Sequence, residues 1–366
     1  MWAGNVEIHV KASDWLLHRH ESDPAYNNVV LHVVYINDYQ AVTQSGETIH
    51  TLAVEPNMPQ ETWERYAQLM QPALPIEIPC MLRLQEVPAL HLNVWMDRLL
   101  VERIERKTAD VRRMLEDSKG DWGTCCYRMI AKYFGGKTNS FAFEMLAKQT
   151  PQRFLGKIKD YPLRVEALLM GQAGLLEGDF QDAYPRQLQK EYQYLSHAYK
   201  LSPMPAHLWK FFRLRPAAFP TVRISQLAYL ITHSNHLFSR LLDTPDAKEL
   251  LKIFDLQASD YWETHYRFDV EAARMPKSAG KSFAETLIIN AWVPLLFEYG
   301  MQHGDENRKE QALSILEQLQ PEKNHITRMW TSCGITAGNA ARSQAQIQLY
   351  NEYCKHKRCL DCQIGY

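Results

Sequence analysis

Three residues near the N-terminus have the types and the spacing that catalysis with a metal ion requires. Glu7, His9 and Lys11 occupy every second position of the run VEIHVK. In a strand, such residues point to one face. A carboxylate there can bind a hard cation such as Mg²⁺, and a neighbouring imidazole or ammonium can orient water. We therefore take Glu7 as a candidate Mg²⁺ ligand and all three residues as catalytic candidates; the alternative is a solvated strand face.

A second group of residues close to the first is rich in histidine. His18 and His20 form an H-x-H pair, and His32 follows, with Asp14 and Asp23 nearby. An H-x-H pair can share a metal ion when the chain is extended. No fixed spacing completes a ligand set, so the alternative is a surface turn with solvated or capping histidines. A metal-dependent hydrolase of small molecules, built on these histidines, is a further hypothesis.

Basic and aromatic residues alternate in the segment WKFFRLRPAAFPTVRIS. Arginine forks suit phosphate groups and aromatic faces suit bases, so this pattern is typical of nucleic-acid contacts. The candidate residues for binding nucleic acid are Lys210, Arg213, Arg215 and Arg223. The alternative is that the arginines bind helix ends and acidic partners while the aromatic rings fill the core.

The C-terminal segment contains closely spaced cysteines. Cys354, Cys359 and Cys362 follow a C-x4-C-x2-C pattern, and Cys333 lies 21 residues before the first of them. Four thiolates can hold zinc or an iron–sulfur cluster. We expect the helix that carries Cys354 to end at residues 357–358, so that the sulfurs converge. The alternative is four unligated thiols.

The elements that must position these residues differ between the start of the chain and the rest. Residues 6–11 alternate as a strand does, and residues 29–36 form the apolar run of a strand covered on both faces. A turn at residues 45–46 before the alternating stretch 47–54 suggests a hairpin. Residues 13–14 could cap a short helix, and Pro24 would end one.

Helical periodicity dominates from about residue 92. In the run 94–118, the apolar residues Met96, Leu100, Ile104, Val111 and Met114 lie near one face. The run 223–242 has a similar stripe. Further helices are expected near 122–134, 138–149, 162–176, 181–199, 283–299, 308–319 and 337–356. The proline-rich segment 71–79 is the best candidate for a boundary.

We therefore predict an α+β protein with two domains. A small, incomplete mixed β-sheet domain would occupy residues 1–80, and a large all-helical domain would occupy residues 81–366. The 366 residues include 41 basic and 42 acidic side chains, and the net charge is −1. This balance excludes binding to nucleic acid or membranes through overall charge, but a local basic patch is compatible with it. The absence of a long apolar run and of a secretory pattern predicts a cytoplasmic protein that does not enter membranes.

The motifs in combination resemble a bacterial family, domain-of-unknown-function family 2851. The resemblance covers nearly the whole chain and carries no known activity. The matching segments are GNVEIHVKASDW, DPAYNNVVLHVVYIND, FGGKTNSFAFEMLA, EALLMGQAGLLEG, WKFFRLRPAAFPTVRI and CKHKRCLDCQIG.

The resemblance also implies a nuclease-like function. Members usually carry a Pro-Asp segment before the VEIH strand, and that order is similar to the PD-(D/E)xK nucleases, in which an Asp and a Glu bind Mg²⁺. Glu7 matches the Glu, His9 stands where the Lys normally is, and Lys11 follows. The printed sequence has no such segment before Glu7, which predicts a misassigned start, a truncation or a form without nuclease activity. The expectation is a nuclease-like protein; the alternative is a non-catalytic nucleic-acid or protein interaction module with a structural metal at the C-terminal cysteines.

Overall fold

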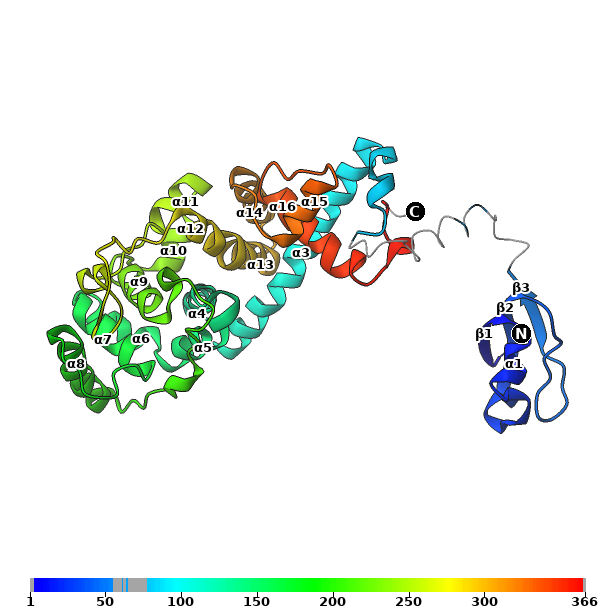
Figure 1. Cartoon of the computed structure of the whole chain (residues 1–366), viewed down its shortest axis with the longest axis horizontal. Helices are drawn as coiled ribbons and strands as arrows, with labels where there is room; N and C mark the ends of the chain where they lie inside the picture. Colours follow the sequence, from blue (N-terminus) through cyan, green and yellow to red (C-terminus); the bar gives the residue numbers. More distant parts are fainter. Residues whose placement is uncertain (1–2, 55–60, 62–63, 65–77, 365–366) are drawn as a thin grey trace. The chain divides into compact units, whose positions relative to one another are not determined.

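The computed structural model describes residues 3–54, 61, 64 and 78–364. The chain divides into two compact units, Met1–Met81 and Leu82–Tyr366. The first unit contains a three-stranded sheet, and the second consists mainly of helices (Figure 1). The α+β class predicted from the sequence is therefore confirmed. Of the proposed boundary segment 71–79, residues 71–77 lie outside the described residues.

The sheet of the first unit is entirely parallel. Its order is β1 (Asn5–Lys11), β2 (Val29–Ile36) and β3 (His50–Ala53). The connection between β1 and β2 contains α1 (Asp14–Leu17) and the 3₁₀ helices η1 (His20–Ser22) and η2 (Pro24–Asn28). Pro24 thus begins a 3₁₀ helix and does not end a helix.

The predicted mixed sheet was wrong, and the predicted hairpin before residues 47–54 is limited to a short antiparallel bridge that does not involve β2. Leu31 of β2 pairs with His50 of β3 in the parallel direction. The turn at Ser45–Gly46 does exist, and it brings Val42 opposite Thr48 in an antiparallel bridge. After β2 the chain turns back along the sheet, and the turn at Ser45–Gly46 then reverses its direction a second time. The next strand therefore runs in the same direction as β2.

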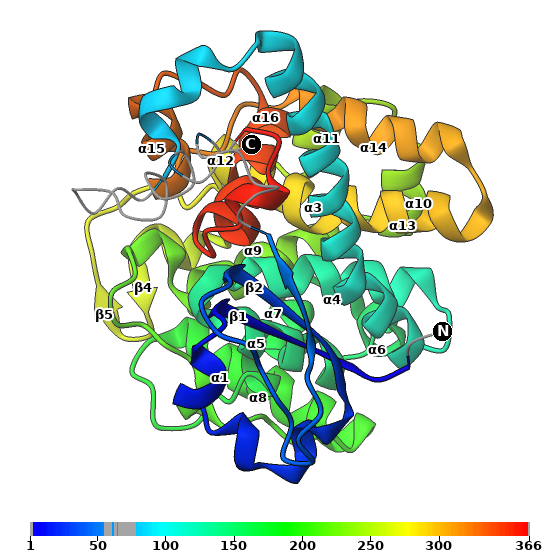
Figure 2. The same ribbon diagram turned by 90° about the vertical axis from the view of Figure 1, so that its right-hand side faces the viewer.

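One face of this small sheet is covered, and the described residues leave the other face of β1 exposed. A cluster of Trp15, Val29, Ala41 and Ile49 forms its core. Helix α1 lies against β1, as Figure 2 shows, and Trp15 on this helix is completely buried. On the opposite face of β1, Val6, Ile8 and Val10 are 51%, 71% and 64% exposed. Glu7 and His9 belong to the covered face, because side chains alternate along a strand.

The second unit begins with its longest helix. Helix α3 (Ala89–Asp117) buries all five apolar residues of the predicted stripe, from Met96 to Met114, and packs against α13 and α16 (Figure 1). The helices that follow it are α4 (Trp122–Phe134), α5 (Gly136–Gln149), α6 (Gln152–Ile158), α7 (Pro162–Gln172), α8 (Ala183–Tyr199), α9 (Pro220–Thr232), α10 (Leu237–Leu242), α11 (Ala247–Ile253), α12 (Lys281–Leu287), α13 (Val293–His303), α14 (Glu306–Gln318), α15 (His325–Ser332) and α16 (Ala340–Leu349).

Three details of this unit differ from a simple array of helices. The predicted helix at 223–242 is divided into α9 and α10, because His236 adopts a left-handed backbone with φ of 49°. Two π-helical segments, η8 (Ile288–Trp292) and η9 (Tyr350–Cys354), continue α12 and α16. The strands β4 (His265–Arg267) and β5 (Val270–Glu271) form a small antiparallel pair, so the unit is not all-helical.

Candidate metal centre

The two groups of candidate residues near the N-terminus form a single cluster in the structure. Strand β1 supplies Glu7 and His9, and His32 of β2 pairs in register with Glu7. Residues His18 and His20, in the connection between these strands, complete the cluster. Among the described residues, His9, His18 and His20 are the sole group of three or more potential ligands whose donor atoms all lie within 4.8 Å of one another.

The distances in this cluster are close to those around a metal ion. His9 Nε2 lies 3.1 Å from His18 Nδ1. Glu7 Oε1 lies 3.7 Å from His9 Nε2 and 3.9 Å from His20 Nε2. Ligand atoms around a tetrahedral zinc ion with bonds of about 2.0–2.1 Å are about 3.4 Å apart. Nitrogen atoms of His9, His18 and His20 are therefore close enough for one metal ion to bind all three after small side-chain adjustments, and the Glu7 carboxylate lies beside two of these rings.

The local backbone explains how His18 and His20 come together. Helix α1 ends at Leu17, and His18 is its C-cap residue. Arg19 then adopts a left-handed conformation with φ of 60° and ψ of 32°. This conformation commonly ends helices, but glycine usually adopts it because a side chain makes it unfavourable. Arg19 therefore has an unfavourable backbone conformation between two potential ligands. Residues in such conformations occur preferentially at functional sites.

Aromatic packing holds the rings of the cluster in place. The ring of Trp15 lies 5.2 Å from those of His20 and His32, measured between centroids, and its indole N–H donates to the carbonyl of Val42 at 2.9 Å. Tyr26 stacks on His20 at 3.7 Å. His20 and His32 are buried and His18 is exposed, so the cluster is accessible from the side of His18.

Electrostatics favour the neutral forms of His9 and His32. Burial lowers the pKa of His9, and the nearby carboxylate of Glu7 opposes that shift. Burial also lowers the pKa of His32, and the neighbouring His9 adds to this effect. Because a metal ion binds the neutral form of histidine, these shifts keep His9 competent to bind metal at and below neutral pH.

The other polar residues near the cluster have different roles. Lys11 is exposed at the end of β1, and its backbone N–H donates to the carboxylate of Asp14 at 2.9 Å. Asp23 accepts from the backbone N–H of Ala25 at 2.8 Å at the start of η2. Both aspartates thus accept hydrogen bonds from backbone N–H groups.

The cysteines of the C-terminal segment do not form a comparable group. Within the described residues, no three cysteine sulfurs lie within 4.8 Å of one another. Cys333 is the C-cap residue of α15, whereas Cys354 ends η9. The π-helical segment ends at Cys354, and after one turn the chain bends at Lys357, whose backbone is left-handed with φ of 52°, at the expected position. Burial is the largest cause of the raised pKa of Cys359, and the nearby Cys362 adds to it. Cys359 and Cys362 are therefore close enough to influence each other, but no third thiol of the described residues joins them within that distance.

The four basic candidates of the helical unit have different environments. Lys210, Arg213 and Arg215 are exposed. Arg213 lies over the ring of Phe212, which is 80% exposed. The guanidinium of Arg223, in contrast, lies 3.5 Å from the ring centroid of Phe283 and donates to Gln226 at 2.8 Å. Arg223 is thus engaged inside the unit by a ring and an amide, and not by the helix ends or acidic partners of the alternative interpretation, while the other three cations are exposed.

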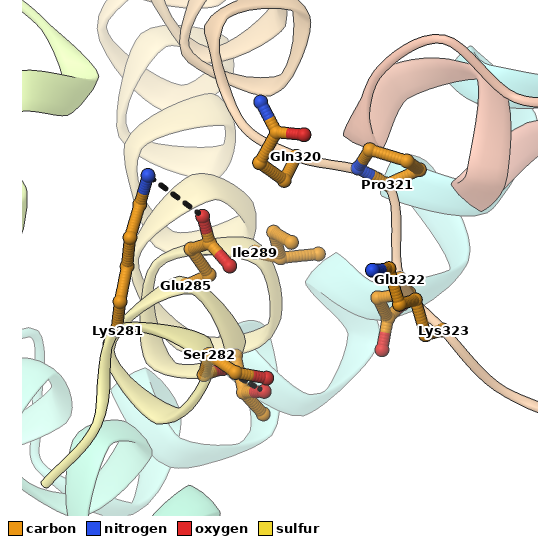
Figure 3. A pocket seen from close by; sticks show the side chains of 9 residues that line it. Lys281, Ser282, Glu285, Ile289, Gln320, Pro321, Glu322 and Lys323 are labelled. Carbon is orange, nitrogen blue, oxygen red and sulfur yellow. Dashed lines mark hydrogen bonds and ion pairs between the residues drawn. The ribbon is translucent and has the colours of Figure 1, made fainter.

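A pocket of about 370 Å³ lies in the helical unit between α12 and the segment that precedes α15 (Figure 3). Lys281 and Glu285 line one side, and Glu322 and Lys323 line the other. Lys281 Nζ lies 3.9 Å from Glu285 Oε1. The charges of the two acidic and two basic side chains cancel, so this pocket does not select a ligand by its charge. The histidine cluster is therefore the better candidate site.

The sequence indicated the residues of the cluster but not their convergence. Along the chain, Glu7 and His9 belong to one group of candidate residues, and the three other histidines, His18, His20 and His32, belong to another. The signal that could have joined them is an H-x-H pair inside a connection between two parallel strands, since such a connection crosses one face of the sheet. Trp15 and Tyr26, which hold the rings, had no sequence signal of their own.

Comparison with known proteins gives a family match only. The family model described as "Protein of unknown function (DUF2851)" matches residues 1–325. No curated protein and no solved structure matches the chain. In the part of the chain that the structure describes, every helix is too short or too polar to cross a membrane.

Proposed function

The chain belongs to the DUF2851 family of proteins of unknown function, and we propose that its N-terminal unit is a metal-dependent hydrolytic centre that acts on nucleic acid. The observation that carries this proposal is the convergence of donor atoms from His9, His18 and His20, with the Glu7 carboxylate 3.7 Å from His9 and 3.9 Å from His20. Three protein ligands with one open position are typical of catalytic zinc sites, whereas structural sites are closed.

The chemistry of the donors supports a transition metal over Mg²⁺. Imidazole nitrogens suit Zn²⁺, Cu²⁺, Fe²⁺ and Ni²⁺, whereas Mg²⁺ prefers oxygen ligands and keeps several waters. The Glu7 carboxylate lies 3.7 Å from His9 and 3.9 Å from His20. The sequence pattern suggested Mg²⁺ at Glu7, and the nitrogen-rich surroundings of Glu7 favour an ion of the zinc class.

We assign a separate role to each residue. His9, His18 and His20 would hold the ion, which would supply Lewis acidity and lower the pKa of a bound water toward about 7. The Glu7 carboxylate, beside two of the ligands, would accept the proton of that water as it attacks phosphorus. His18, which is exposed, lies on the side from which a substrate would enter.

Nucleic acid is the proposed substrate class because of the surface of the helical unit. Lys210, Arg213 and Arg215 are exposed near Phe212, and such a combination suits phosphates and bases. The net charge of −1 gives the chain no general attraction for polyanions, so binding would depend on this local patch.

The test begins with the metal. Purified full-length protein is analysed for bound elements, treated with a chelator, and titrated with Zn²⁺, Mn²⁺ and Mg²⁺ separately. Cleavage of labelled single- and double-stranded DNA and RNA is then measured with each ion. We expect binding of about one Zn²⁺-class ion per chain and cleavage that the chelator abolishes.

Matched variants distinguish the cluster from other sites. His18→Ala should abolish both metal binding and cleavage, whereas His50→Ala, an exposed histidine on β3, should change neither. Metal binding without cleavage of any substrate would favour the interaction-module alternative. Cleavage with Mg²⁺ alone that survives His18→Ala would contradict the histidine centre.

A further inference from the structure

His32 lies behind the proposed metal ligands and takes no part in the three-histidine group itself. Its side chain is completely buried. Its Nε2 atom lies 2.9 Å from Nδ1 of His9. Its other ring nitrogen, Nδ1, is buried and has no hydrogen-bond partner among the described residues. His32 therefore has one polar contact at the cluster, and that contact is with a ligand.

The short distance between the two rings restricts where their protons lie. One of the two facing nitrogens must carry a proton and the other must accept it. If His9 Nε2 binds a metal ion, the proton of His9 must be on Nδ1, which then donates to His32 Nε2. A neutral His32 must in that case carry its own proton on Nδ1, the atom without a partner.

Without a metal ion, the opposite arrangement is more favourable. His32 Nε2 then donates to His9 Nδ1, and His9 Nε2 carries the proton of that ring. His9 Nε2 can donate in turn to His18 Nδ1, which is 3.1 Å away. This arrangement leaves a lone pair unpaired at His32 Nδ1 instead of an N–H group, and buried N–H groups without a partner are the rarer and more costly case.

We infer that His32 is a positioning residue that sets the tautomer of His9, and that metal binding reverses the tautomers of both rings. The inference rests on the proposed metal centre and deepens it. Each ring keeps one proton, which moves from Nε2 to Nδ1 through exchange with solvent, so the tautomer change itself releases no net proton. A second residue that orients a metal-bound histidine commonly changes metal affinity by 10- to 100-fold when it is removed.

The first measurement identifies the tautomers. Long-range ¹H–¹⁵N spectra of the full chain, labelled at histidine, distinguish protonated Nδ1 from protonated Nε2. His9→Gln and His32→Gln spectra assign the two rings. We expect both rings as Nε2–H in metal-free protein, and both as Nδ1–H after addition of Zn²⁺. A metal-free His32 with its proton on Nδ1, or a His32 tautomer that Zn²⁺ leaves unchanged, would overturn the inference.

The second measurement is the affinity for Zn²⁺ in competition with a chromophoric chelator. His32→Leu removes the acceptor and keeps an apolar side chain in a buried position, so it should weaken Zn²⁺ binding by about 10- to 100-fold. His32→Gln places a carbonyl oxygen near the position of Nε2 and should recover most of that loss. His50→Leu, the same substitution on the neighbouring strand, should leave the affinity unchanged.

The outcomes separate this inference from the proposed function. If wild-type protein binds Zn²⁺ but His32→Leu and His32→Gln bind it equally tightly while both remain folded, the role of His32 is wrong and the metal centre stands. If wild-type protein does not bind Zn²⁺, the metal centre is wrong, and with it the metal-driven reversal. The tautomers of the metal-free protein would then still show whether His32 donates to His9. A folded state is verified by the melting temperature of each variant.

Discussion

His9 and His18 lie with Nε2 and Nδ1 only 3.1 Å apart, although one residue belongs to strand β1 and the other ends helix α1. Their ring centroids are 4.9 Å apart and the ring planes make an angle of 62°. Such a pair can share either one proton or one metal ion. Because Glu7 and His20 face the same region, the metal ion is the alternative that uses all four side chains.

Glu7→Gln separates metal binding from proton transfer. If the carboxylate acts as the base for water, this variant should bind Zn²⁺ within a few-fold of wild type and lose cleavage by about 10²- to 10⁴-fold. Zn²⁺ titration and a cleavage assay on the same preparation test this expectation. Glu47→Gln, an exposed residue of the same unit, is the control. A large loss of Zn²⁺ affinity would show instead that Glu7 is a fourth ligand.

Arg19→Gly should stabilise the N-terminal unit. Arg19 has φ of 60°, and a left-handed conformation costs about 1–2 kcal/mol for residues with a side chain. Part of this gain is offset by the greater freedom of glycine in the unfolded chain, so we expect a net gain of about 1 kcal/mol or less. Hydrogen-exchange protection of the β1 and β2 amides measures it. Arg19→Ala, which keeps the strain, should not show the gain.

The cysteines should not contribute to metal binding. A Cys359→Ser, Cys362→Ser double variant should retain the full content of bound metal, because the cysteine sulfurs are not gathered in the described structure. A His18→Ala, His20→Ala double variant should lose that content. Elemental analysis of anaerobically purified protein decides between the two sites. Loss of zinc or iron from the cysteine variant would restore the thiolate site that the sequence pattern suggested.

Lys107 should make the stability of the helical unit depend on pH. Its ammonium donates to Asn290 at 2.7 Å and to Gln344 at 2.8 Å. Burial, with Arg103 adding to the effect, lowers the pKa of Lys107 to about 7 from 10.5. Between these two values the unfolded chain binds the proton and the folded chain does not. The free energy of unfolding should therefore rise with pH in this window, by at most about 1.4 kcal/mol per pH unit from this group.

The matched variants for this effect are Lys107→Met and Lys248→Met. Urea unfolding at several pH values between 7 and 10 gives the slope for each protein. Subtracting the slope of Lys107→Met from that of wild type removes the contribution of every titrating group that the substitution leaves unchanged. The exposed Lys248 should leave the wild-type slope unchanged on substitution. Equal slopes for wild type and Lys107→Met would show that the ammonium stays charged.

Glu166→Ala should destabilise the helical unit by about 3 kcal/mol, because it leaves buried donors without an acceptor. The Glu166 carboxylate accepts from the indole N–H of Trp262 at 2.7 Å and from the hydroxyl of Ser225 at 2.9 Å. Trp262 and Ser225 are both buried. Chemical denaturation measures the loss. Glu263→Ala, which removes a surface ion pair with Arg274, should cost less than about 1 kcal/mol.

Local patterns in the sequence were sufficient for most of the secondary structure. The apolar stripe from Met96 to Met114 predicted the buried face of α3, because a helix repeats every 3.6 residues wherever it lies. The alternation at residues 6–11 predicted β1, with Glu7 and His9 on one face. These features depend on residues within a few turns or along a single strand, and so the sequence shows them directly.

Relationships between distant segments required the tertiary structure. The direction of β3 could not be inferred, because a turn at Ser45–Gly46 looks the same whether it joins paired strands or reverses a returning segment. The environment of Arg223 likewise differs from that of the exposed arginines, because its guanidinium packs on the ring of Phe283, which lies 60 residues further along the chain.

The α+β class, the DUF2851 family and the presence of four carboxylates and four imidazoles in the first 32 residues all follow from the amino-acid sequence. The meeting of the Glu7 carboxylate with these imidazoles, in contrast, depends on the fold. The parallel pairing of β1 with β2 carries the connecting segment across one face of the sheet, and the left-handed turn at Arg19 directs His18 and His20 toward His9. A metal ion requires donors that converge in space, and spacing along the chain does not specify that convergence.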